Sequence, residues 1–89
     1  MTKATRNHVQ ERDSYTCILC NRAATDIHHI TSRSQGGTNH PHNLAALCRQ
    51  HHDLLHGVIW QGVDLTADEA YQAIVEYVSD YYAGKWRPR

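Results

Sequence analysis

The sequence lacks the features on which large cores, membrane spans and disulfide frameworks depend. It has 89 residues with no Phe, and its longest apolar run, Leu44 to Cys48, is far shorter than the roughly 20 residues of a membrane span. Three cysteines cannot close into a complete disulfide framework, and the N-terminus shows no secretory signal. We therefore expect one small cytoplasmic domain whose limited core needs support from a metal.

The chain also has no net charge, because its nine basic and nine acidic residues cancel. The cancellation is uneven along the chain. Residues 58–84 contain acids and no base, whereas residues 1–57 and the tail 85–89 carry the basic surplus. Since binding depends on local fields, an anionic partner would be met by the first two-thirds of the chain and by the tail.

The predicted elements are short, except for one helix near the C-terminus. A polar helix or turn is expected at 5–14, strands at 26–30 and 44–47 around a loop at 32–42, a helix at 49–56, and an ambiguous stretch with room for a short strand at 58–65. The last helix begins with a capping box, Thr66 and Glu69, and should end near Tyr82 before Gly84. Its apolar stripe consists of Ala70, Ile74, Tyr77 or Val78, and Tyr81.

Histidine is abundant, with eight residues beside the three cysteines, and the spacing of both types predicts metal sites. Cys17-x-x-Cys20 and Cys48-x-x-His51 have the spacing of two zinc knuckles, which together would hold a structural Zn²⁺ in a tetrahedron. The alternative is that the three cysteines are small core residues or unpaired thiols.

A second group of histidines is separated from the first by helix geometry. Consecutive helical residues are rotated by about 100°, so His51 and His52 cannot face the same ion, whereas His52 and His56 share a face. Successive strand residues point to opposite sides, so only one of His28 and His29 can join that pair. Three His ligands would leave open coordination positions, as in catalytic sites. The alternative is a set of surface histidines with no common target.

Five motifs follow one another along residues 6–57: Arg12-Asp-Ser-Tyr-Thr-Cys-x-x-Cys20, Ile27-His-His-Ile30, Ser34-Gln-Gly-Gly37, Asn43-Leu-x-x-Leu-Cys48 and His51-His-x-x-x-His56. In this order they resemble the motifs of the zinc-stapled HNH endonuclease family of small phage and bacterial proteins. The resemblance implies a small α+β fold, the ββα-metal motif, here with a zinc knuckle pair and a C-terminal amphipathic helix.

The resemblance also implies a role for each matching residue. His29 would be the general base that activates water, and Asn43 would fix the loop that orients it. One catalytic divalent metal would be held by His28, His52 and His56. Many family members have Asp at the position of His28 and Cys at that of His51. The all-nitrogen set favours Zn²⁺, Ni²⁺, Co²⁺ or Mn²⁺ over Mg²⁺.

DNA phosphates are the expected partner of the basic side chains, which give affinity without sequence information. These are Arg6, Arg12, Arg22, Arg33, Arg49, Lys85, Arg87 and Arg89. An internal pairing with Asp13 or Asp26 is an equal alternative for Arg12. Trp86 could stack on a base or close the core. His40 and His42, in the loop, are expected to be solvent-exposed.

The predicted function is therefore metal-dependent hydrolysis of DNA phosphodiester bonds by an HNH endonuclease. The alternatives are a zinc-stapled nucleic-acid-binding module with little or no cleavage and a metal-storage or metal-sensing protein. Residues 1–89 should form one domain, with the nuclease core at 6–57, an extension at 58–84 and the basic tail at 85–89. We expect a monomer or homodimer, and by analogy phage DNA-packaging partners in the host cytoplasm.

Overall fold

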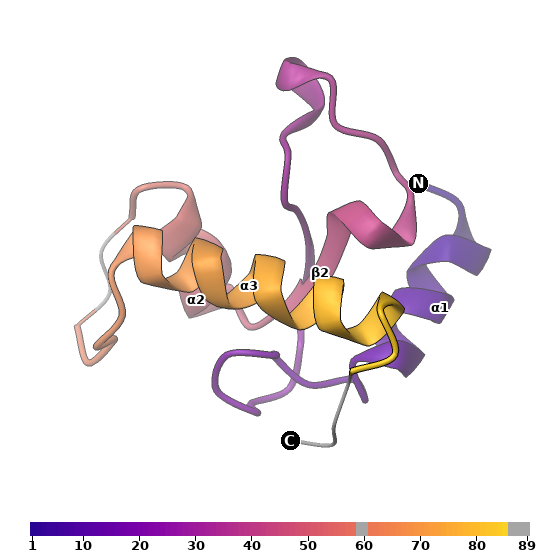
Figure 1. Cartoon of the computed structure of the whole chain (residues 1–89). Coiled ribbons are helices and arrows are strands. Elements are labelled where there is room, and N and C mark those ends of the chain that lie inside the picture. The colour runs from indigo at the N-terminus through magenta and orange to yellow at the C-terminus, as the bar shows by residue number, and fades with distance from the viewer. Residues whose placement is uncertain (59–60, 86–89) are drawn as a thin grey trace.

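The computed structural model describes residues 1–58 and 61–85 as three helices and one two-stranded sheet (Figure 1). In chain order the elements are α1 (Lys3–Arg12), β1 (Asp26–His29), η1 (Arg33–Gln35), η2 (Pro41–Asn43), β2 (Leu44–Leu47), α2 (Arg49–Leu55) and α3 (Ala67–Tyr82), where η1 and η2 are single 3₁₀ turns. The predicted small α+β fold is confirmed. Within the described residues, no helix combines the length and apolar character needed to cross a membrane.

The two strands form an antiparallel hairpin whose long connection projects away from the rest of the molecule (Figure 1). His28 pairs with Ala45 and His29 pairs with Leu44. All four residues of β2 are buried, and Ala45 and Leu47 belong to the core cluster that also contains Ile74. The pairing therefore sets the register of the two histidines against a fully buried strand.

The long helix α3 crosses the core and has the boundaries that the sequence predicts. Thr66 and Glu69 form both hydrogen bonds of the capping box. Ala70, Ile74 and Val78 are its buried residues. Gly84 follows with a φ of +79°, the left-handed conformation that ends helices without steric cost. In the ambiguous stretch at 58–65 the described residues form no strand, and Ile59 and Trp60 lie outside the described residues.

The side chain of Asp13 is fully buried and joins three elements. Both its oxygens accept hydrogen bonds from the Arg12 guanidinium, at 2.7 and 2.8 Å. Oδ2 also accepts from the backbone N–H of Ala46 in β2, and Oδ1 accepts from the hydroxyl of Tyr77 in α3, at 2.9 and 3.0 Å. A bidentate pair with these extra donors satisfies a buried carboxylate.

Arg12 completes the same network from the end of α1, with a side chain that is 0% exposed. Its Nη1 donates to the carbonyl oxygen of Pro41 at 2.8 Å and to the hydroxyl of Tyr82 at 3.3 Å, and its Nη2 donates to the carbonyl oxygen of Leu44 at 2.6 Å. The expected DNA contact of Arg12 is therefore wrong. The internal pairing with Asp13 is what the fold uses, and Arg12 is removed from the set of phosphate-binding residues.

Replacing Arg12 with Met should lower the free energy of unfolding by about 3–5 kcal/mol, because Asp13 would remain buried without its counter-charge. The measurement is urea unfolding followed by circular dichroism. Arg49→Met is the matched control, since the Arg49 side chain is 63% exposed and its ion pairs lie at the surface. That control should change stability by less than about 1 kcal/mol. Equal unfolding midpoints for the two variants would contradict the central role of the buried pair.

Candidate functional site

The three cysteines and His51 converge on one point between the turn after α1 and the start of α2. One possible donor atom from each of Cys17, Cys20, Cys48 and His51 lies within 4.8 Å of the other three. Cys20 Sγ is 3.7 Å from Cys48 Sγ, and His51 Nδ1 is 3.3 Å from Cys48 Sγ and 3.6 Å from Cys17 Sγ. Tetrahedral ligands around Zn²⁺ are separated by about 3.3–3.8 Å, given the usual bond lengths. The four residues therefore fit such an ion.

Local backbone geometry explains this convergence. Cys48 is the N-cap residue of α2, so His51 follows about one turn later on the same side of the helix. The other pair lies in a tight turn, where the N–H of Asn21 donates to the carbonyl oxygen of Cys17 at 2.9 Å and Asn21 has a φ of +64°. The N–H of Leu19 also points at Cys17 Sγ, 3.4 Å away. Such an amide helps to stabilise negative charge on the sulfur.

Protonation of this cluster depends on whether a cation is present. Burial raises the pKa of the Cys17 thiol to about 11, and the backbone N–H groups that point at its sulfur offset only part of this effect. A bound metal would supply a positive charge and favour the thiolate, which is the ligating form. Burial and the charge of Arg22 lower the pKa of His51, which keeps its imidazole in the neutral, ligating form.

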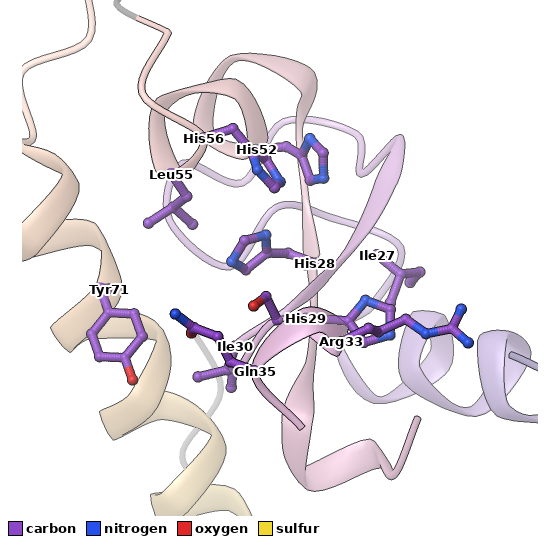
Figure 2. A pocket seen from close by; sticks show the side chains of 11 residues that line it. Ile27, His28, His29, Ile30, Arg33, Gln35, His52, Leu55, His56 and Tyr71 are labelled. Atoms are coloured by element: carbon purple, nitrogen blue, oxygen red, sulfur yellow. The ribbon is translucent and has the colours of Figure 1, made fainter. Parts of the chain in front are cut away.

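A second convergence brings together His28 from β1, His52 from α2 and His56, the residue that directly follows α2 (Figure 2). Their possible donor nitrogens all lie within 4.8 Å of one another. The ring centroid of His28 is 5.6 Å from that of His52 and 5.4 Å from that of His56. The ring centroids of His52 and His56 are 4.6 Å apart. Of the two strand histidines, His28 is the one that joins the helix pair.

The donor chemistry of this cluster fits a divalent cation. Nδ1 of His28 and Nδ1 of His52 are buried without a hydrogen-bond partner among the described residues. An orphaned ring nitrogen is unfavourable, and a metal would satisfy it. Burial, followed by the neighbouring His52 and His56, lowers the pKa of His28 to about 4, and burial also lowers that of His52. His28 is therefore neutral, and able to donate a lone pair, well below pH 7.

His29, next along β1, leaves the strand in a different direction from His28 (Figure 2). Its Nε2 lies 2.8 Å from Oδ1 of Asn39. An oxygen acceptor at this distance selects the tautomer with hydrogen on Nε2 and leaves the lone pair on Nδ1. The contact of Asn39 with His29 could not be predicted from the sequence, because Asn is an ordinary turn residue in a loop that contains Gly and Pro.

The loop that carries Asn39 is held closed by Asn43. Oδ1 of Asn43 accepts from the N–H of Thr31 at 2.8 Å, and its Nδ2 donates to the carbonyl oxygens of Thr31 and Thr38, at 3.0 and 2.9 Å. At Gly37 a Cβ would lie 1.8 Å from the carbonyl oxygen of Thr31, so only glycine fits that crossing. These contacts tie both ends of the loop beside β1.

Residues 17–57 match the family model described as HNH endonuclease. This segment is therefore similar to an HNH endonuclease domain. The match spans both groups of potential ligands, both strands and α2, and it leaves α1 and α3 outside. No curated protein matches the chain.

A pocket of about 320 Å³ opens over the cluster of His28, His52 and His56 (Figure 2). His28, His29, His52 and His56 all line it. Arg33 and Gln35 from the projecting loop form part of its wall, and Tyr71 reaches it from α3. The pocket therefore brings the three-histidine cluster, His29 and the side chain of Arg33 to one cavity.

The remaining basic residues of the predicted DNA surface are distributed around the molecule. Arg6, Arg22 and Lys85 are exposed, and Arg22 donates a hydrogen bond to Gln50. Arg49 is 63% exposed while pairing with Asp26 and Asp53 at 3.2 and 3.3 Å. Such surface pairs are weak and leave the guanidinium available to another anion. Trp86, Arg87 and Arg89 lie outside the described residues.

The two loop histidines outside the clusters are exposed, as expected, but they are not isolated. The rings of His40 and His42 stack with centroids 4.4 Å apart, and His42 meets Tyr82 of α3 edge-on at 3.8 Å. These contacts connect the end of the loop that leads into β2 with Tyr82 of α3.

Cobalt(II) is a suitable probe of the cysteine cluster, because cobalt–thiolate bonds give charge-transfer absorption in the near ultraviolet. The reconstituted protein should show this absorption, and Cys48→Ser should weaken it and abolish cooperative thermal unfolding, since such sites contribute folding energy. His56→Ala is the control, because it alters only the histidine cluster and should leave the band intact. An unchanged band in Cys48→Ser would refute a shared metal site.

Proposed function

We propose that the protein is a metal-dependent endonuclease that hydrolyses phosphodiester bonds in DNA. The observation that carries the proposal is the pocket in which three histidines converge next to a fourth, His29, which is oriented by a hydrogen bond to Asn39. The match of residues 17–57 to the HNH endonuclease family model supports a nuclease in general. The particular substrate and the roles of the residues are our inference from the geometry.

His29 acts as the general base in this proposal. Hydroxide is repelled by an anionic phosphodiester, so the nucleophile has to be generated in place from water. The hydrogen bond to Asn39 leaves Nδ1 of His29 free to take that proton, while Nε2–H stays directed at the amide oxygen. Asn43 does not contact the base in this proposal. It closes the loop that places Asn39 beside the imidazole of His29.

His28, His52 and His56 would hold the catalytic cation, which would stabilise negative charge on the phosphate and on the departing 3′ oxygen. Three nitrogen donors favour Zn²⁺, Ni²⁺, Co²⁺ or Mn²⁺ over Mg²⁺, which prefers oxygen ligands. The cysteine cluster would hold a structural Zn²⁺ instead, with no open position. Arg33 is the side chain best placed to contact the phosphate from the wall of the pocket.

The second candidate function is binding of nucleic acid without cleavage. The cysteine cluster and the exposed arginines would serve that function equally well. Binding without cleavage, however, requires neither the histidine pocket nor the oriented His29. The histidine cluster therefore favours the enzyme.

His29→Ala should reduce plasmid cleavage by about 10²- to 10⁴-fold, the usual contribution of a positioned general base. The assay compares wild type and variant with Mn²⁺, Co²⁺, Ni²⁺, Zn²⁺ and Mg²⁺ in turn, and Mg²⁺ should support the weakest activity. His40→Ala is the matched control, because His40 is an exposed loop histidine outside both clusters. Equal rates for wild type and His29→Ala would end the nuclease proposal, and cleavage supported by Mg²⁺ alone would overturn the ligand set.

Asn39→Ala should lower kcat about 5- to 10-fold and leave KM almost unchanged, because one orienting hydrogen bond to His29 is lost. Asn39→Asp keeps an oxygen acceptor at the same place and should retain more activity than Asn39→Ala. Steady-state cleavage of a labelled oligonucleotide gives both constants. Identical losses in the two variants would argue against an orienting role for this contact.

A further inference from the structure

Tyr71 enters the histidine pocket from α3, an element outside the HNH match (Figure 2). It is one of only a few large apolar side chains that are exposed in the described part of the chain, at 41%. It lies off the buried stripe of α3, so core packing does not account for it. An exposed aromatic ring in the wall of a reaction pocket is a candidate for direct contact with the substrate.

The position of this ring is fixed by α3. Tyr71 follows the fully buried Ala70 and lies one turn before the buried Ile74. The capping box between Thr66 and Glu69 secures the first turn of the helix immediately before it. The side chain therefore stands at the border between core and solvent on a rigid backbone, not on a loop.

The surroundings of the ring combine apolar surface with groups that suit an anion. Ile30 and Leu55 line the pocket and offer apolar contact. Arg33 and Gln35 come from the projecting loop, and both are exposed. Among the described residues, none of the ring–ring or cation–ring contacts involves Tyr71. An exposed aromatic ring and a cationic side chain in the wall of one pocket are the kind of groups that bind single-stranded nucleic acid, the ring by stacking on a base and the cation by meeting the backbone.

We propose that Tyr71 stacks on an unpaired base next to the scissile phosphate, so that the preferred substrate is DNA with single-stranded or unpaired nucleotides at the cleavage site. This inference rests on the proposed nuclease function and specifies its substrate. In a continuous duplex both faces of each base are covered by neighbouring base pairs. A protein ring can stack only where a base is already unpaired or is drawn out of the helix.

The test uses binding in the absence of cleavage, with His29→Ala as the background. The probe is a short single-stranded oligonucleotide that carries 2-aminopurine, whose fluorescence is quenched when the base stacks, and a duplex of the same sequence is measured in parallel. Tyr71→Leu should weaken single-strand binding about 5- to 150-fold, the range known for loss of one stacked base. It should also relieve the quenching, whereas duplex binding should change little.

Two matched variants distinguish stacking from a hydroxyl contact and from a general effect of losing a surface tyrosine. Tyr71→Phe keeps the ring and should bind and quench like the parent, which excludes a contact made only through the hydroxyl. Tyr15→Leu alters another exposed tyrosine that lies outside the pocket and should have no effect. Unchanged single-strand binding in Tyr71→Leu would overturn the proposal. Equal weakening in Tyr71→Phe and Tyr71→Leu would also overturn it.

A cleavage experiment distinguishes failure of this inference from failure of the nuclease function. Proteins with native His29 are compared on single-stranded and duplex DNA, and the parent should cut the single strand faster, with Tyr71→Leu losing that preference. A parent that cuts both substrates equally, with Tyr71→Leu unchanged, refutes the role of Tyr71 and leaves the nuclease standing. A parent that cuts neither substrate with any ion refutes the nuclease. The inference fails with it, since no cleavage site remains.

Discussion

The buried pair of Arg12 and Asp13 is the interaction on which the arrangement of this small protein depends. The two residues are adjacent in sequence at the end of α1. Their side chains form hydrogen bonds with three other parts of the fold: the end of the hairpin loop, the strand β2 and the long helix α3. A core made mainly of Leu, Ile, Val and Ala cannot fix such directions by itself, because apolar packing is not directional. Fully satisfied hydrogen bonds specify one arrangement of the three elements.

The short helix α2 contributes residues to both groups of potential metal ligands. α2 begins directly after Cys48, so the cysteine cluster anchors its first turn. The rotation between successive helical residues then turns His52 and His56 toward β1. In the proposed nuclease this support would hold the base and the ligands in place, because small displacements of such groups weaken catalysis strongly. The closed cluster and the open pocket are thus parts of the same local geometry.

Much of the fold could be predicted, because its signals are local. The strand at 44–47 and the end of α3 lie where apolar pattern, capping residues and Gly84 put them. The separation of His51 from His52 also follows from helix geometry alone. The hydrogen bond of Asn39 to His29 could not be predicted, because it depends on how a loop closes. For Arg12 the sequence left two choices open, and burial decided between them.

The sequence by itself determined which residues could serve as ligands and base, since chemical type and spacing within one helix or strand are local properties. Only the tertiary structure decided which of them meet. It directed His28 toward α2, withdrew Arg12 from solvent, and placed Tyr71 of α3 in a pocket made by residues far away in the chain. Contacts between distant segments depend on how all the elements pack together, and short-range periodicity carries no information about that packing.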